Sequence, residues 1–209
     1  SIQGGPIDVP DSEPLRNELE DFAAAVREGR APLVGGEDGR RAVDLAERER
    51  DAAFAVNAKG PEVLASEAKR AGTVLIHYST DFVFDGTATE PYPEDAPAAP
   101  LNVYGASKLA GEQAIAASGA HALTLRTSWV YGRRGRNFLL TIRRLARERD
   151  ELTIVADQTG TPNWAVALAE ATAALVGRGL PYLVERAGLY HLSAAGSTTW
   201  YGFAQAIVG

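Results

Sequence analysis

The 209-residue sequence predicts an α/β fold built on a parallel sheet. From about residue 43 onward, helical and strand-like segments alternate, which is typical of βαβ units whose sheet is covered on both faces. The strand-like segments are short and apolar, as expected of buried strands. Hydrophobic residues make up 45% and charged residues 23% of the chain, both ordinary for a globular domain. A chain of this length can bury a substantial core without disulfide or metal staples.

The expected elements follow in chain order. Residues 13–29 carry apolar side chains at three- and four-residue spacing and predict an amphipathic helix, and a second helix is expected over residues 37–57. Further helices are predicted over residues 60–72, 103–119, 138–150, 165–177 and 203–209. Strands are predicted over residues 73–79, 121–132, 152–157 and 189–194. The alternation begins only after the first two helices, so we expect two parts: a helical segment over 1–42 and an α/β domain over 43–209.

Composition excludes several classes of function. Cysteine is absent, which removes disulfides, thiolate metal sites and cysteine nucleophiles, and no metal site is expected. The net charge of −6 disfavours nucleic acid as a partner. No apolar run approaches 18 residues and no signal-like segment opens the sequence, so we expect a cytoplasmic protein without a membrane span. Methionine is also absent, so we expect the chain to be processed or part of a longer protein.

Tyr104 and Lys108 form the sharpest chemical motif. Four residues apart on a helix, they lie on one face. A tyrosine hydroxyl has an ordinary pKa of about 10, which a nearby cation lowers, so the pair is a plausible general acid and base. Ser79 and Thr80 follow the strand expected over 73–79, where ligands of open α/β sheets bind. The competing interpretations are a surface helix pair and hydroxyls that only cap the strand end.

Five segments together resemble the dTDP-4-dehydrorhamnose reductase family of extended short-chain dehydrogenase/reductases. They are, in order, HYSTDFVFDGT, PLNVYGASKLAGE, LRTSWVYG, VADQTGTP and GLYHLSAAGSTTWYGFA. The resemblance covers about residues 43–209. It implies a Rossmann-like sheet with a small substrate-binding lobe, and reduction of the C4 ketone of a dTDP-6-deoxy-hexulose with NADPH or NADH.

The resemblance also implies roles for individual residues. Tyr104 would protonate the developing alkoxide, while Lys108 would hold the nicotinamide ribose and depress the tyrosine pKa. Thr80 would polarise the carbonyl, with Ser79 beside it at the cofactor. Asp81 and Trp129 would contact the sugar, although Trp129 could equally fill a core. Asn57 lies where the family orders the helix of the active site, but a buried side chain bonded to backbone is the simpler interpretation.

A dinucleotide-binding fold needs a glycine-rich first turn, and neither G-x-G-x-x-G nor G-x-x-G-x-x-G occurs in the sequence. The nearest candidate has Gly35, Gly36 and Gly39, but Glu37 and Asp38 would repel a phosphate at that helix start. We therefore expect a partial Rossmann-like sheet that lacks its first strands and its glycine loop. Residues 1–42 resemble instead the C-terminal tail of Gfo/Idh/MocA-family oxidoreductases.

Three functions remain open from sequence. The first is the reductase, impaired if the missing loop is needed, with a dTDP-sugar as substrate. The second is a non-catalytic sugar-nucleotide-binding or regulatory protein, since relatives of the reductase serve as regulatory subunits of methionine adenosyltransferase. The third is a sugar-nucleotide epimerase. In each case the strand over 73–79 would have an uncovered edge, and either the N-terminal segment of this chain or a second chain, in a homodimer or with another partner, would cover it.

Overall fold

The computed structural model describes residues 38–209. The helix expected over 13–29, and nearly all of the segment over 1–42, lie outside the described residues. The second expected helix, over 37–57, forms in pieces. These are α2 (Asp38–Arg48), α3 (Arg50–Phe54) and the π-helical η1 (Ala55–Lys59), followed directly by α4 (Gly60–Arg70). The first break falls at Glu49, whose backbone has left the helical region at φ −124° and ψ 57°.

The central sheet is parallel, as predicted. Its strands are β1 (Leu75–Thr80), β2 (Ala122–Thr127) and β6 (Gly188–His191), in the order β1-β2-β6. Leu75 lies opposite Ala122, and Leu123 opposite Gly188. The carboxyl ends of β1 and β2 therefore meet at one edge of the sheet, where Thr80 pairs with Thr127.

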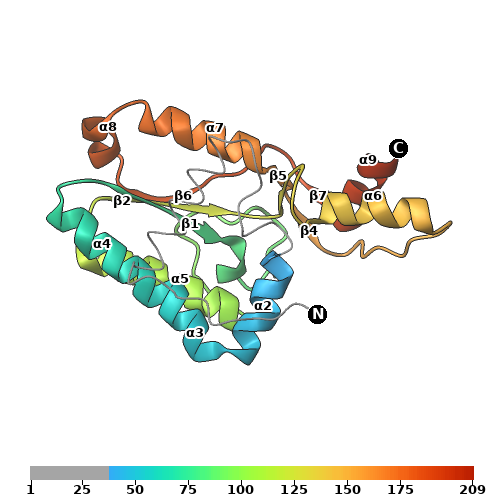
Figure 1. Ribbon diagram of the computed structural model, residues 1–209, viewed down its shortest axis with the longest axis horizontal. Helices are drawn as coiled ribbons and strands as arrows, with labels where there is room; N and C mark the ends of the chain where they lie inside the picture. The colour runs from blue at the N-terminus through green and yellow to red at the C-terminus, as the bar shows by residue number, and fades with distance from the viewer. Residues whose placement is uncertain (1–37) are drawn as a thin grey trace, which may run out of the picture. The chain divides into compact units, whose positions relative to one another are not determined.

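Helices cover both faces of this sheet (Figure 1). On one face α4 and α5 (Val103–Ser118) pack through a cluster of Ala65, Ile115 and Ala122. On the other, α7 (Ala165–Val176) and α8 (Leu180–Glu185) cover a second cluster that contains Leu123, Leu125 and Leu183. Neighbouring residues of β2 alternate between the two clusters, because successive side chains of a strand point to opposite faces. The apolar runs that predicted buried strands thus reflect burial on both sides.

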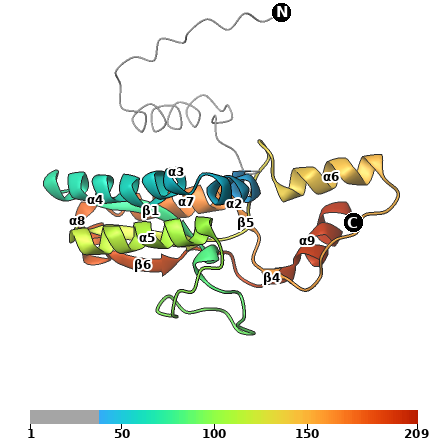
Figure 2. The ribbon, with the colours of Figure 1, turned by 90° about the horizontal axis from the view of Figure 1, so that it is seen from below.

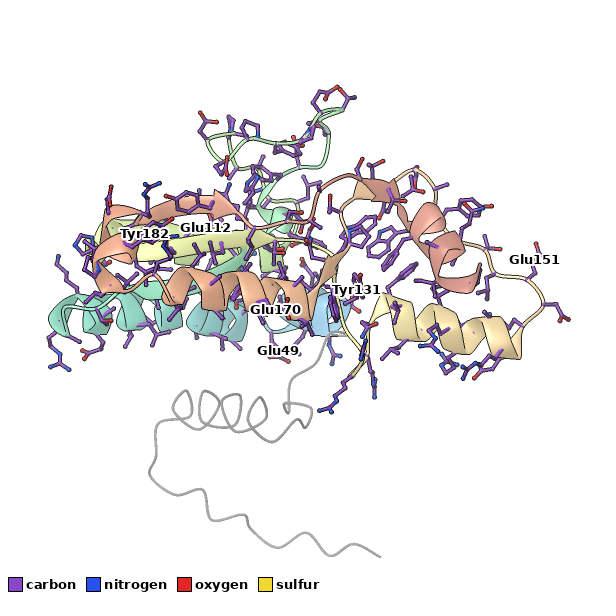
Figure 3. All side chains as sticks on the ribbon, turned by 90° about the horizontal axis from the view of Figure 1, so that it is seen from above. Glu49, Glu112, Tyr131, Glu151, Glu170 and Tyr182 are labelled. Atoms are coloured by element: carbon purple, nitrogen blue, oxygen red, sulfur yellow. The ribbon has the colours of Figure 1, made fainter. Side chains whose placement is uncertain are left out.

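A smaller lobe follows the sheet (Figure 2). It contains α6 (Phe138–Glu148), α9 (Trp200–Val208) and two short strand pairs. The strand pairs are β3 (Val130–Tyr131) with β5 (Asn163–Trp164), and β4 (Thr159–Gly160) with β7 (Thr198–Thr199). Aromatic side chains form its core: Phe138 lies 4.5 Å from Trp200 and 5.5 Å from Phe203, measured between ring centroids. Tyr131, labelled in Figure 3, packs on Phe203 at 5.3 Å.

Two strand predictions were wrong. Residues 152–157 form no strand, although their sequence is β-rich. Val155 is 52% exposed and its carbonyl accepts a single hydrogen bond from Tyr201 N at 3.0 Å, so this run has no neighbouring strand to pair with. The strand expected over 121–132 is divided at Trp129, whose φ of 43° is left-handed. Because such a backbone cannot continue a strand, β2 ends in the central sheet and β3 starts in the lobe.

Candidate active site

The strand-end hydroxyls lie where the sequence predicts them. Ser79 and Thr80 are the last two residues of β1 and both are buried. Thr80 Oγ1 donates to Asp81 Oδ1 at 3.2 Å and accepts from Phe82 N at 3.2 Å, which caps the short helix η2 (Asp81–Val83). Ser79 Oγ is buried without a hydrogen-bond partner. A buried polar atom left unpaired is costly, so its place at a strand end is consistent with a bound ligand.

Helix α5 carries Tyr104 in its first turn. Asn102 Oδ1 accepts from Gly105 N at 2.7 Å and so fixes where the helix begins. A Cβ on Gly105 would lie 2.1 Å from the carbonyl oxygen of Phe82, so only glycine lets the helix approach η2 this closely. The Phe82 and Tyr104 rings meet edge-on with centroids 5.7 Å apart. The approach brings the Tyr104 phenol close enough to Thr80 for the threonine hydroxyl to lower the tyrosine pKa.

Lys108, one turn further along α5, reaches β1 from the helix. Its Nζ donates to the carbonyl oxygen of Tyr78 at 2.6 Å and lies 3.4 Å from His77 Nε2. Burial lowers the pKa of Lys108 to about 8, and the Glu112 carboxylate opposes this shift. Thr80, Tyr104 and Lys108 therefore share the carboxyl end of β1, and a surface pair on a solvated helix is excluded.

The tyrosine pKa differs from the sequence-based expectation. Burial raises the pKa of Tyr104, the Thr80 hydroxyl lowers it, and the negative charge of Asp81 raises it again. Lys108 is not among the groups that shift this pKa, and its ammonium donates instead to the Tyr78 carbonyl of β1. Burial also raises the pKa of Asp81 from 3.8 to about 6, against the hydrogen bond from Thr80. Both groups are thus held toward their protonated forms.

Trp129 lies in the lobe and stacks on Trp200, with ring centroids 3.5 Å apart and planes at 11°. The edge of its indole covers Gly160, where an added Cβ would lie 2.5 Å from Trp129 Cε2. These contacts favour core packing for Trp129, and its contact with a sugar stays a prediction.

A buried ion pair behind the site was not predicted from sequence. Arg126 on β2 donates to both carboxylate oxygens of Glu112, at 2.9 and 2.6 Å, and the two side chains are only 6% and 7% exposed. Glu112, labelled in Figure 3, comes from the same face of α5 as Tyr104 and Lys108. Arg126 also donates to the Glu94 carbonyl at 3.2 Å, and Glu94 accepts from His191 N at 3.1 Å. The pair thereby connects α5, the strands β2 and β6, and the loop after η2. The positions of Glu112 and Arg126 in the sequence do not predict that they pair.

Two asparagines fix the neighbouring backbone. Asn57 Nδ2 donates to Ser107 Oγ at 3.0 Å, and Ser107 Oγ donates to the Tyr104 carbonyl at 2.8 Å, so Asn57 orders α5 through a side-chain contact rather than a backbone one.

Asn163 is fully buried; its Nδ2 donates to the carbonyls of Ser128 and Thr161, and its Oδ1 accepts from Ala194 N at 2.7 Å. It joins three loops that lead into the lobe.

Within residues 38–209, no helix is long and apolar enough to cross a membrane. The same part of the chain holds no cluster of three or more acidic or histidine side chains suited to a metal ion.

Comparison with known proteins gives one consistent result. Residues 17–209 match the family described as RmlD substrate binding domain. The chain is 47% identical over 192 residues to a dTDP-4-dehydrorhamnose reductase of Burkholderia thailandensis, covering 90% of this chain and 64% of that protein. It is 45% identical over 185 residues to the Escherichia coli enzyme of the same name, covering 88% and 62%. The chain thus spans just under two thirds of the length of these relatives.

Solved structures agree. A dTDP-4-dehydrorhamnose reductase from Bacillus anthracis in complex with NADP superposes with a TM-score of 0.71 at 42% identity, covering 79% of this chain and 57% of that one. The orthologue from Clostridium acetobutylicum gives a TM-score of 0.73 at 38% identity, with the same coverage. The family match begins inside the segment over 1–42, whose resemblance to Gfo/Idh/MocA enzymes finds no support here.

Proposed function

We propose, on the premise that this chain belongs to the RmlD substrate binding domain family, that it carries the substrate-binding and proton-transfer half of a dTDP-4-dehydrorhamnose reductase. One observation supports this most directly. Thr80, Tyr104 and Lys108 converge at the carboxyl end of β1, the edge where open α/β sheets bind their ligands.

The chemistry follows from this convergence. The C4 carbonyl oxygen of the sugar accepts hydrogen bonds from Tyr104 and from Thr80, whose hydroxyl exchanges Asp81 for the sugar as its acceptor, and these bonds draw electron density away from C4. As hydride adds to C4, the carbonyl π electrons pass to oxygen, and Tyr104 gives its phenolic proton to that oxygen, so the ketone becomes an alcohol. The raised pKa of Tyr104 keeps this proton in place until negative charge develops on the sugar oxygen.

The hydride must come from a reduced nicotinamide, NADPH or NADH, and that is the chemistry the cofactor supplies. The residues near the reacting centre fit its ribose end. The Lys108 ammonium has three N–H groups, of which two face Tyr78 O and His77, and Ser79 Oγ lacks a partner. The pyrophosphate end has no matching glycine loop within the 209 residues.

We assign the sugar of the nucleotide substrate to the carboxyl end of β1, where Thr80 and Asp81 lie. Asp81 follows Thr80 directly and lies close enough for its charge to affect Tyr104, so it can contact the sugar beside the reacting carbon. Trp129 is proposed to border the sugar with the part of its ring that Trp200 leaves free. Both the dTDP-sugar and the reduced nicotinamide are cytoplasmic metabolites, so we place the reaction in the cytoplasm.

The uncovered edge of β1 is a place where a cofactor-binding unit could join the sheet. In the part of the chain that the structure describes, β1 pairs with β2 alone, and half-exposed Tyr78 lies on it. An edge strand with unpaired backbone groups readily accepts another strand. We propose that a nucleotide-binding unit or a second copy of this chain covers it.

A non-catalytic sugar-nucleotide-binding or regulatory protein is the alternative, and the missing glycine loop favours it. Purified chain would be mixed with dTDP-4-dehydrorhamnose and NADPH, and NADPH oxidation followed beside formation of dTDP-L-rhamnose. Turnover above background would exclude the alternative. Saturable sugar-nucleotide binding without turnover would establish it, and the absence of both binding and turnover would contradict both proposed functions.

A further inference from the structure

Lys108 is held at the sheet by two acceptors on neighbouring residues. The Tyr78 carbonyl lies 2.6 Å from Nζ and His77 Nε2 lies 3.4 Å from it. An ammonium group only donates hydrogen bonds, so His77 must accept at Nε2 and carry its proton on Nδ1. The contact therefore fixes the tautomer of His77.

The strand register explains why His77 is in reach. Successive residues of β1 alternate between faces, so Leu75, His77 and Ser79 share the face covered by α5. His77 lies opposite Thr124, which is buried. The partly buried imidazole thus lies between the sheet and α5, two residues before Ser79 on the same face of β1.

We infer that His77 is a positioning residue for the reduction, which holds the Lys108 ammonium by accepting a hydrogen bond at Nε2 and leaves its remaining N–H for the ribose of the cofactor. This inference rests on the proposed function. His77 touches neither substrate nor reacting atoms, so it acts only through Lys108.

The surroundings of His77 keep its imidazole uncharged, as a hydrogen-bond acceptor for Lys108 must be. Burial lowers the pKa of His77 to about 3, and the positive charge of Lys108 adds to the shift. At neutral pH the imidazole is therefore uncharged and cannot repel the ammonium. Glu112 of α5 also acts on Lys108; it raises the lysine pKa but is already paired with Arg126. Tyr104, one turn earlier on α5, lies beside Thr80.

The test measures the Lys108 pKa by heteronuclear NMR in the full chain, without substrate or cofactor. His77→Phe removes the acceptor and keeps a ring, so the ammonium loses a partner and its pKa should fall by up to about one unit, a tenfold change in proton affinity. His77→Gln places an amide oxygen near the position of Nε2 and should restore most of the value. His121→Gln, at an exposed histidine, is the matched control and should leave Lys108 unchanged.

A Lys108 pKa that stays the same in well-folded His77→Phe would overturn the inference. If that variant does not fold, the unmodified chain still decides, because the inference requires the proton of His77 on Nδ1, and a protonated Nε2 contradicts it. Lys108→Met should raise the pKa of His77, since it removes a neighbouring positive charge. If the pKa shifts occur but the unmodified chain does not turn over substrate, the reductase assignment fails while the His77–Lys108 contact stands.

Discussion

Individual side chains decide how rigid the candidate site is. Glu112 and Arg126 bury opposite charges behind Tyr104 and Lys108, in a two-point contact that fixes the angle between α5 and β2. Such a pair adds little net stability over apolar packing, but breaking it leaves a buried charge uncompensated. Its value here is positional, because Arg126 also holds the Glu94 carbonyl of the loop that links Thr80 to Tyr104.

Arg126→Leu should therefore lower the free energy of unfolding by about 3–5 kcal/mol, as measured by urea denaturation. Arg144→Ala serves as the control. It breaks an exposed pair with Glu148 on α6 and should cost less than about 0.5 kcal/mol. Equal losses in the two variants would contradict the positional role of the buried pair.

Asp81 gives the site a pH dependence. Because burial raises its pKa from 3.8 to about 6, the folded protein holds this proton more tightly than the unfolded chain does. The resulting stabilisation is complete below 3.8 and is lost as the pH rises through about 6. Asp81→Asn should flatten this part of the stability profile and make the protein more stable than the unmodified chain at pH 7. Thermal unfolding across the range checks it, and an unchanged slope would count against the burial of Asp81.

At the scale of elements, α5 is placed by close backbone approach. A Cβ on Gly111 would lie 2.1 Å from the Asn57 carbonyl oxygen, so the π-helical turn η1 packs directly on the backbone of α5. This turn also brings Asn57 to Ser107, and π-helical turns are frequent at functional sites.

Gly111→Ala should force η1 and α5 apart and destabilise the fold by about 1–3 kcal/mol, with a parallel loss of sugar-nucleotide binding. Gly60→Ala is the matched control, because its Cβ would meet nothing closer than 3.8 Å and alanine favours a helix. Urea denaturation of both variants gives the comparison. Gly111→Ala at least as stable as the parent chain would show that the approach is not required.

The sequence predicted elements where the local pattern and the tertiary environment agree. The strands of the central sheet were found because apolar runs are buried on both faces, and α5 because Gly119 ends it in a left-handed conformation. The run over 152–157 carries the same local signal but has no neighbouring strand, so the prediction failed. Trp129 interrupts its strand through a backbone conformation that no residue pattern announces.

In the candidate site, too, some residues could be predicted from local sequence and others could not. Thr80, Tyr104 and Lys108 were found from spacing on a helix and position at a strand end. The acceptor role of His77 and the pairing of Glu112 with Arg126 depend on which strand faces α5 and in what register, and these are properties of the folded sheet.

Across the whole molecule, the residues proposed for proton transfer are present, whereas the glycine loop that would bind the cofactor's pyrophosphate is not. The chain spans 64% of the length of its Burkholderia relative, and under the proposed function its residues would hold only the ribose end of a nicotinamide cofactor, because the sequence has no glycine loop. The proton-transfer half can therefore be present where most of the cofactor's binding energy is not.

Because the glycine loop is missing, we predict that the chain binds the nucleotide of the sugar substrate more tightly than it binds NADPH. In calorimetric titrations of the purified chain, dTDP should bind at least about 100-fold more tightly than NADPH, a difference of about 2.7 kcal/mol. NADPH binding as tight as that of dTDP would show that this chain holds the pyrophosphate by other means.

The most direct measurement of the central claim follows deuterium through the reaction. The purified chain would be incubated with dTDP-4-dehydrorhamnose and NADPH carrying deuterium at both positions of nicotinamide C4, and the sugar nucleotide analysed by mass spectrometry. The account predicts dTDP-L-rhamnose with one deuterium on C4 from the unmodified chain, and at least about 100-fold less from Tyr104→Phe, which cannot supply the proton. Labelled product formed equally fast by Tyr104→Phe, or no labelled product from the unmodified chain, would contradict it.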